Sequence, residues 1–263
     1  MDNELAGIEH RFANLCTEVG RQGVIGFAAV EGVRLLPEQS QRLQQKLAAF
    51  EQGSTPVAVS FGLFYREPEI LAIPATWEGG KAATERWNDY ARAYQELNRT
   101  LDHVSSALAA EFGGVAEKAT IEGWAGKVKH VGDYFAHCVS HRAFAEVARL
   151  GWRGRHGLIV TPEAGPALRF ATVFISGNER GAGGPSHGTL SPQRELAGCG
   201  ECRACLDVCP ILRAARTAGQ TPADYAGGAR DYREVCRRRL HALGLAADVC
   251  GICVRVCWER IRS

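Results

Sequence analysis

The sequence predicts an α/β or α+β sandwich that is followed by a small cysteine-rich module at its C-terminal end. Three observations predict this arrangement. Apolar segments with helical spacing alternate with short, β-branched apolar segments over residues 1–176. Eight of the ten cysteines lie after residue 198. Residues 177–198 are rich in Gly, Ser and Pro and have no periodicity, which is typical of a connection. We therefore expect two domains, residues 1–190 and 191–263.

Helical periodicity and β-branched runs define the elements of the first domain. Leu5, Ile8 and Phe12 begin an apolar stripe with steps of three and four residues, which predicts an amphipathic helix. By the same reasoning, helices are predicted over residues 4–20, 37–50, 84–113 and 134–150. Strands are predicted over residues 24–30, 56–65, 115–121, 157–161 and 168–176.

Length and composition indicate an ordinary folded protein. The chain has 263 residues, of which 46% are hydrophobic and 23% are charged, and its formal net charge is +2. This balance does not indicate a general nucleic-acid or membrane binder. No apolar run approaches the roughly 20 residues that span a bilayer. The first residues lack the basic start and apolar stretch of a signal peptide. We expect a cytoplasmic protein with no membrane partner.

The first cysteine motif has the spacing of an iron–sulfur protein. Cys199, Cys202, Cys205 and Cys209 are separated by two, two and three residues, and Pro210 follows. In the bacterial ferredoxin run with this spacing, three cysteines hold one cluster and the fourth reaches a second cluster. Zinc sites also use cysteines two residues apart, but they need four ligands in two pairs. The motif therefore favours [4Fe–4S] clusters over zinc, and with them electron transfer.

A second motif supplies most of the remaining ligands. Cys250, Cys253 and Cys257 repeat the last three positions of the same run, and Cys236 is the cysteine available nearby for the missing one. Trp258 follows where a ferredoxin usually has proline. The resemblance to ferredoxins implies two clusters with crossed ligand sets. Those sets are Cys199, Cys202, Cys205 and Cys257 for the first cluster, and Cys209, Cys236, Cys250 and Cys253 for the second.

Arginines gather in the last 34 residues of the chain. They are Arg230, Arg233, Arg237, Arg238, Arg239, Arg255, Arg260 and Arg262. Two interpretations remain open. The arginines form a solvated face that balances anionic clusters, or they form a docking patch for an acidic electron donor such as a flavodoxin.

Residues 141–176 carry a family resemblance. They read HRAFAEVARLGWRGRHGLIVTPEAGPALRFATVFIS. A helix that ends before Gly151-Trp152, a turn at residues 153–156, an apolar strand and then Gly165 follow one another in this segment. It resembles the segment that precedes the double-cluster module in the epoxyqueuosine reductases and their relatives, the reductive dehalogenases. The position of Cys236, well before the other three cysteines of the second motif, is also typical of that family. The resemblance covers about residues 85–257.

This resemblance implies a fold and a set of cofactors. It implies a nitroreductase-like domain that holds cobalamin in a base-off state beside the nearer cluster, which makes the protein a cobalamin-dependent reductase. The reduced cobalt reacts with the substrate, and a reduced flavodoxin or ferredoxin supplies the electrons. The cofactor-binding residues carried over to this sequence are His141, Arg142, Gly151, Trp152, Gly154, His156 and Leu158. Gly151 and Gly154 fit either a close approach to the cofactor or a tight turn.

The sequence also departs from the family pattern. The family's Asp-Tyr-His run corresponds here to Ala93-Tyr94-Gln95, so the acid that donates a proton is absent, with Asp89 one turn earlier. Tyr94 becomes the catalytic candidate, as a proton donor, although it also lies on an apolar stripe that fits core packing. The sequence ends six residues after Cys257, without the extension that grips transfer RNA in the family. We therefore expect a small-molecule substrate and regard tRNA as an unlikely partner.

Several polar residues have two interpretations. Arg153, Arg155 and His156 either meet the phosphate or propionamide edges of cobalamin or are solvated. His137 and His141, one turn apart, either bind a metal or have a structural or cofactor-proximal role. Cys16 and Cys138 are expected to be small buried apolar residues.

Two other functions are compatible with the sequence. One is a non-catalytic protein that transfers electrons or handles cobalamin. The other is a flavin-dependent reductase on the same scaffold. Retained cobalt, retained flavin or neither would distinguish the three.

Overall fold

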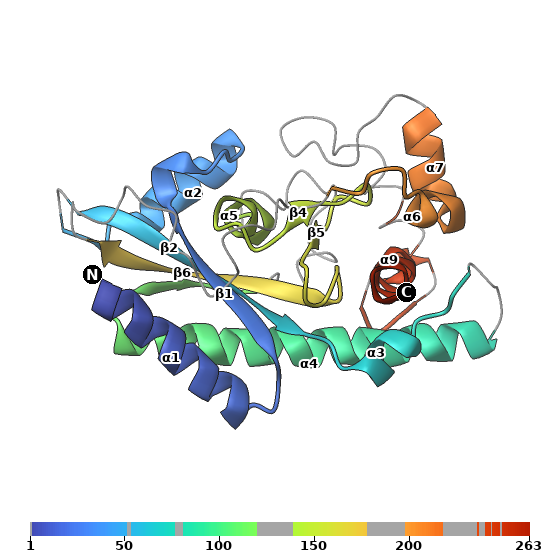
Figure 1. Ribbon diagram of the computed structural model, residues 1–263, viewed down its shortest axis with the longest axis horizontal. Coiled ribbons are helices and arrows are strands. Elements are labelled where there is room, and N and C mark those ends of the chain that lie inside the picture. The colour runs from blue at the N-terminus through green and yellow to red at the C-terminus, as the bar shows by residue number, and fades with distance from the viewer. Residues whose placement is uncertain are drawn as a thin grey trace.

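The computed structural model describes residues 2–51, 54–76, 81–119, 139–177, 198–217, 236, 240–242, 244–247 and 249–263. In this part of the chain a four-stranded sheet lies between two layers of helices, and the C-terminal helices pack at one end (Figure 1). The predicted mixture of helices and strands is confirmed. Of the two predicted classes, α/β and α+β, the structure belongs to α+β, because every strand pair of the sheet is antiparallel.

The main sheet has the strand order β1-β2-β6-β3. Its strands are β1 (Gly23–Ala29), β2 (Thr55–Phe64), β3 (Val115–Glu117) and β6 (Leu168–Gly177), and the short 3₁₀ helix η1 (Val30–Gly32) follows β1. The two central strands, β2 and β6, pair along all ten residues of each. Both are buried over most of their length, which explains why their sequences are almost continuously apolar instead of alternating.

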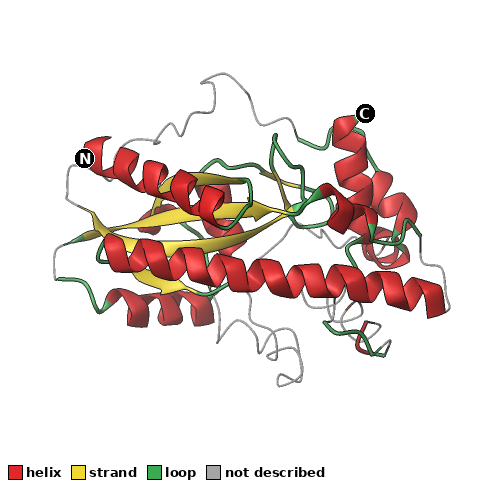
Figure 2. Cartoon of the chain, turned by 90° about the horizontal axis from the view of Figure 1, so that it is seen from below, coloured by secondary structure: helices red, strands yellow, loops and turns green. Residues whose placement is uncertain are grey.

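Helices cover both faces of this sheet (Figure 1). On one face lie α1 (Asp2–Glu18) and α4 (Lys81–Glu111), and on the other lie α2 (Pro37–Leu47) and α5 (His141–Val147). Each face therefore has its own apolar core. Figure 2 shows that α4 extends beyond the sheet as far as the C-terminal helices, so one helix spans both parts of the molecule. No helix in the described part of the chain is long and apolar enough to cross a bilayer.

A small hairpin differs from the prediction. β4 (Trp152–Arg153) and β5 (Ile159–Val160) pair only with each other. The strand predicted over residues 157–161 is therefore shorter and lies outside the main sheet. The helix predicted over residues 134–150 is also shorter in its described part, since α5 begins at His141 and Arg149 adopts a left-handed conformation (φ 56°) beyond its end. Residues 134–138 lie outside the described residues.

The C-terminal cysteines lie on and around short helices. These are α6 (Ala204–Val208), α7 (Pro210–Thr217) and α9 (Ile252–Arg262), and α9 contacts both α6 and the short α3 (Glu67–Leu71). α9 also contributes Ile252, Val254 and Trp258 to the core that α1 and α4 share with the sheet. The boundary predicted between residues 190 and 191 falls outside the described residues.

Candidate metal and cofactor site

Four cysteine thiols from two distant segments gather beside α9. Cys199, Cys202 and Cys205 lie in the loop and first turn of α6, and Cys257 lies in α9. Burial, followed by the nearby thiols of Cys205, Cys199 and Cys202, raises the pKa of the Cys257 thiol to about 12. The helices α6 and α9, which carry Cys205 and Cys257, contact each other, so the two cysteine segments lie side by side.

A second group of thiols adjoins the first. Desolvation by the surrounding protein raises the pKa of the Cys253 thiol well above its ordinary value, and the thiols of Cys250, Cys209 and Cys236 add to the rise. A smaller contribution comes from Cys205, so the two groups are neighbours. The two groups have the membership that the ferredoxin cross-over implies. The role of the eight cysteines as cluster ligands stays a prediction.

The arrangement of the thiols suits four-iron clusters. A [4Fe–4S] cluster takes one thiolate at each iron, so its ligands surround a volume instead of converging on one point. Thiols bind metals as thiolates, and the positive charge of bound iron would oppose the raised pKa values. The donor set therefore fits iron–sulfur clusters.

Arg155 joins the β4–β5 hairpin to the first thiol group. Its Nη2 donates to the carbonyl oxygen of Gly200 at 2.6 Å, and its Nε donates to that of Cys202 at 3.0 Å. From the sequence, we expected the Arg155 side chain either to meet the edge of cobalamin or to be solvated. Its partners are instead backbone carbonyls of the cysteine loop, and this contact holds the predicted cofactor segment against the predicted first cluster.

His156, in the same turn, is buried and has an unused hydrogen-bond donor. Burial, with a smaller effect of the Arg142 charge, lowers the pKa of His156 to about 4, so the ring is neutral at pH 7. Its Nδ1 accepts the N–H of Leu158 at 3.1 Å, which leaves the ring proton on Nε2. That Nε2 is buried without a hydrogen-bond partner, and so is Nε1 of Trp152. Two buried N–H groups, one on His156 and one on Trp152, therefore have no hydrogen-bond acceptor among the described residues. Because a protonated Nε2 does not coordinate a metal, this atom of His156 can act here only as a hydrogen-bond donor.

Other predicted cofactor residues build the hairpin and its support. His141 accepts the hydroxyl of Thr172 at Nδ1 (3.0 Å) and donates from Nε2 to the carbonyl of Lys118 (2.8 Å), so both ring nitrogens are engaged. Burial lowers the pKa of His141. Arg142 donates to the carbonyl of Gly157 at 2.7 Å, across the hairpin turn. His137 and Cys138 lie outside the described residues.

The two glycines of the hairpin are explained by close packing. A Cβ at Gly151 would lie 2.2 Å from the carbonyl oxygen of Val160, and one at Gly154 would lie 2.7 Å from Cε1 of His156. Of the two interpretations left open by the sequence, the tight turn accounts for Gly151. A Cβ at Gly154 would lie 3.1 Å from the unpaired Nε2 of His156, so the glycine leaves space directly beside that atom.

Tyr94 is half-buried on α4, and its ring faces a cation. The guanidinium carbon of Arg169, on β6, lies 4.0 Å from the ring centroid. Arg169 also donates to the side-chain oxygen of Asn98, one turn further along α4. Asp89 is exposed and pairs with Arg92. The catalytic role of Tyr94 stays a prediction.

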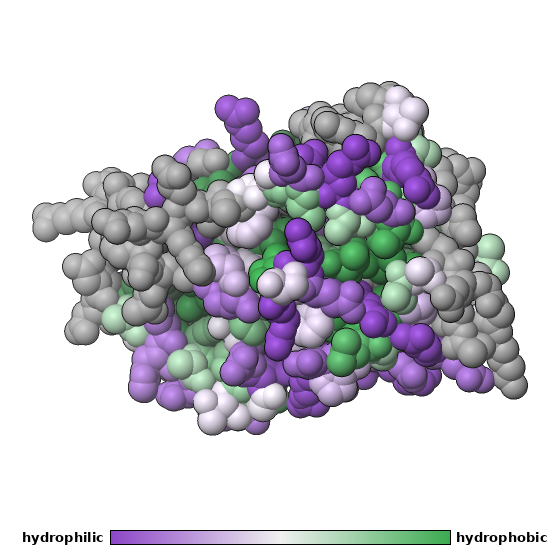
Figure 3. All heavy atoms as spheres, turned by 45° about the vertical axis from the view of Figure 1, so that its right-hand side comes forward, coloured by the Kyte–Doolittle hydropathy of each residue, from purple (hydrophilic) through white to green (hydrophobic). Residues whose placement is uncertain are grey.

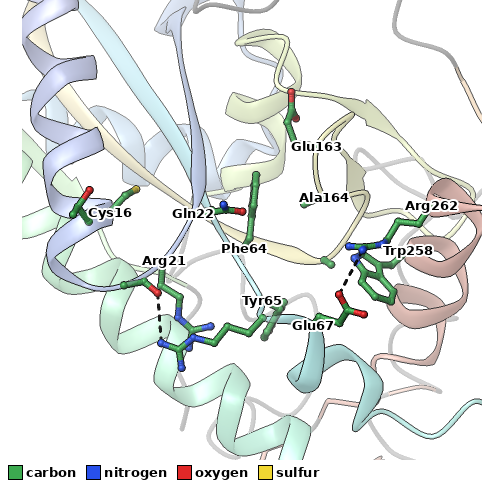
Figure 4. A pocket seen from close by; sticks show the side chains of 14 residues that line it. Cys16, Arg21, Gln22, Phe64, Tyr65, Glu67, Glu163, Ala164, Trp258 and Arg262 are labelled. Carbon is green, nitrogen blue, oxygen red and sulfur yellow. Dashed lines mark hydrogen bonds and ion pairs between the residues drawn. The ribbon is translucent and has the colours of Figure 1, made fainter.

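A cavity that the sequence did not predict opens beside α9 (Figure 4). Its volume is about 420 Å³. Its walls include Phe64, Tyr65 and Trp258, and both Glu67 and Arg262 lie at its edge, where they form an ion pair of 3.4 Å. Figure 3 shows the molecule from the side of its C-terminal helices, where apolar atoms reach the surface between charged side chains. Only the position of Trp258 directly after Cys257 could have pointed to this cavity in the sequence.

These features define a mixed α and β protein with a cysteine-rich module, and comparison with known proteins identifies its relatives. No family model matches the chain. An epoxyqueuosine reductase of Pseudomonas aeruginosa is 27% identical over 146 residues, which are 55% of this chain and 33% of that protein. One of Alicycliphilus denitrificans is 31% identical over 99 residues, which are 32% of this chain and 24% of that protein. The resemblance predicted from the sequence is therefore confirmed: parts of the chain are similar to epoxyqueuosine reductases, and the matched regions span a third or less of these two enzymes.

Solved structures of epoxyqueuosine reductases are also similar. That from Streptococcus thermophilus has a TM-score of 0.44 and 17% identity, over 96% of this chain and 66% of the other. A second, described as bound to an epoxyqueuosine-modified tRNA stem loop, has a TM-score of 0.38 and 18% identity, over 81% of this chain and 53% of the other.

The expected partners need correction. The sequence led us to expect a small-molecule substrate and to regard tRNA as unlikely. That expectation is wrong, because the related enzyme was solved with a modified tRNA stem loop. The absence of an acid at position 93 and the end of the sequence after Cys257 were too weak a basis for it.

Proposed function

We propose that this chain is an iron–sulfur reductase that holds two [4Fe–4S] clusters and uses them to supply electrons to a cobalamin bound against the β4–β5 hairpin. The observation that supports this proposal most strongly is the pairing of two thiol groups with a hairpin that Arg155 fixes to the first of them. In this proposal residues 1–190 form the cofactor and substrate domain, and residues 191–263 form the cluster domain.

The chain's own residues would hold and orient the cofactors. Cobalamin, when bound, supplies a metal centre whose reduced form is a strong nucleophile or reductant. The Nε2–H of His156 and the Nε1–H of Trp152 would each donate to an amide or phosphate oxygen at its edge. Because His156 keeps its proton on Nε2, it would donate to the periphery of the cofactor and would not coordinate its metal.

Tyr94 is the proton donor in this proposal. Its ring is held between α4 and the guanidinium of Arg169, a contact that orients the phenol and keeps a cation next to it. A positioned phenol can supply a proton to a reduced intermediate, as a general acid does.

We further propose that the substrate is a modified nucleoside within tRNA. Support comes from the two curated relatives, both named epoxyqueuosine reductase, and from the solved complex with an epoxyqueuosine-modified stem loop. Arg260 and Arg262, exposed on α9, can contribute contacts to phosphates.

Retention of cobalt tests the cofactor proposal. Anaerobically reconstituted protein is incubated with cobalamin, passed through a gel-filtration column and analysed for metals. We expect about eight irons per chain from two four-iron clusters and cobalt near one per chain. The His156→Phe variant should bind cobalamin about tenfold more weakly, the effect of one lost hydrogen bond, with unchanged iron. His103→Phe, at an exposed position of α4, is the matched control. Cobalt near zero with full iron would exclude cobalamin and leave an electron carrier.

A separate experiment tests the substrate. The loaded protein is incubated with dithionite and an anticodon stem loop that contains epoxyqueuosine, and the RNA is analysed by mass spectrometry. We expect the nucleoside to lose one oxygen atom and RNA binding to weaken with salt. A stem loop that is neither bound nor reduced by protein with full iron and cobalt would show that the substrate proposal is wrong.

A further inference from the structure

Arg155 places a positive charge against the loop that carries the first group of cysteines. Its Nη2 donates to the carbonyl oxygen of Gly200 at 2.6 Å, and its Nε donates to that of Cys202 at 3.0 Å. The carbonyl and the thiol of Cys202 belong to the same residue, so only a few covalent bonds separate the accepting oxygen from the sulfur. A guanidinium is always protonated at neutral pH. A permanent cation therefore lies next to a predicted ligand of the first cluster.

The surroundings of Arg155 leave its charge directed at this loop. Arg153, two residues earlier in the hairpin, pairs with the carboxylate of Glu146. Within the part of the chain that the structure describes, no carboxylate forms such an ion pair with Arg155, whose partners are the two carbonyls. Glu201 and Arg203, on either side of Cys202, carry opposite charges and are both exposed. Arg155 is half-buried, where water and salt screen a charge less.

We propose that the charge of Arg155 raises the reduction potential of the first cluster. This inference rests on the iron–sulfur part of the proposed function and deepens the role of the β4–β5 hairpin. Reduction adds one electron to a cluster and makes it more negative, so a fixed cation nearby stabilises the reduced form more than the oxidised form. Because it binds backbone carbonyls of the cysteine loop, Arg155 is a positioning residue and not a cluster ligand. The segment proposed to hold cobalamin would thus also set how easily the neighbouring cluster is reduced.

The test is a redox titration of the reconstituted protein, followed by electron paramagnetic resonance. Arg155→Gln removes the charge and keeps an amide that can donate to a carbonyl. We expect one cluster potential to become more negative, the other to change much less, and iron to remain near eight per chain. Arg155→Lys keeps the charge and should leave both potentials close to those of the unaltered protein.

A matched control and a second background assign the effect. Arg153→Gln also removes a cation of the hairpin, but one that Glu146 already compensates, so both potentials should stay unchanged. The double variant Cys209→Ser/Cys236→Ser is expected to keep the first cluster alone. Arg155→Gln should lower the single potential of that protein, and an unchanged potential there would show that the first cluster is not the one affected.

Three further results would overturn the inference. The first is an Arg155→Gln protein with full iron and two unchanged potentials. The second is an equal shift in Arg155→Lys, which would assign the effect to the lost hydrogen bonds. The third is an equal shift in Arg153→Gln, which would assign it to the net charge of the hairpin.

A loss of iron in Arg155→Gln calls for a closer mimic of arginine. Citrulline at position 155 keeps the planar shape and the Nε–H donor of arginine without its charge. It should lower the same potential, and no change would also overturn the inference. Iron near zero in the unaltered protein would instead contradict the proposed function.

Discussion

Single buried charges connect distant parts of this chain, and Arg21 is the clearest case. Its side chain is 1% exposed, and it makes two hydrogen bonds to Glu69, of 2.7 and 2.9 Å, and a third to Glu96, of 3.1 Å. Arg21 follows α1, Glu69 belongs to α3, and Glu96 belongs to α4, so one guanidinium ties three helices together. A planar group with five donors is suited to such a junction.

Replacement of Arg21 should therefore destabilise the protein strongly. Arg21→Met leaves the largely buried carboxylate of Glu69 without its cation, which we expect to cost roughly 3 to 5 kcal/mol. Urea unfolding with circular dichroism measures the change in the free energy of unfolding. Arg11→Met is the control, because Arg11 pairs with the exposed Glu18 and Glu111 and its loss should have a much smaller effect. Equal losses in the two variants would show that the buried junction is not important.

At the scale of elements, the β4–β5 hairpin depends on backbone packing that only glycine allows. Gly151→Ala would bring a methyl group within 2.2 Å of the Val160 carbonyl, so the strands must separate. We expect a loss of about 1 to 3 kcal/mol, typical of overpacking, and a lower melting temperature in calorimetry. Gly198→Ala is the control, since a Cβ there would meet nothing within 4 Å. Equal melting temperatures in the two variants would contradict this account of the hairpin.

The same elements show what sequence patterns can and cannot predict. The strands β2 and β6 were predicted because most of their residues are apolar or β-branched, which leaves few alternatives. The two-residue strands of the hairpin are too short to show a period, so the strand predicted over residues 157–161 was too long, and its pairing with residues 152–153 was not predicted. The cysteine groups followed from spacing, whereas the Arg155 contact joins residues 45 and 47 positions apart and leaves no local signal.

At the scale of the whole molecule, α4 unites the sheet with the cysteine module. One end packs against β6, and the other end binds the segment before Cys250 through Asn88 and Gln95. α9 enters the same core through Ile252 and Trp258. The predicted cluster module is therefore built into the α+β fold of the described residues instead of being attached through a flexible contact, which would keep a fixed distance between clusters and cofactor.

The central claim is that eight cysteines hold two four-iron clusters with crossed ligand sets. The most direct test is the iron content of two double variants after anaerobic reconstitution. Cys209→Ser/Cys236→Ser removes two ligands of the second cluster alone, so we expect about four irons per chain to remain of the roughly eight in the unaltered protein. Cys199→Ser/Cys209→Ser removes one ligand from each cluster and should leave far fewer. The reverse result, with iron retained in the second variant and lost in the first, would mean that each motif holds its own cluster and would contradict the account.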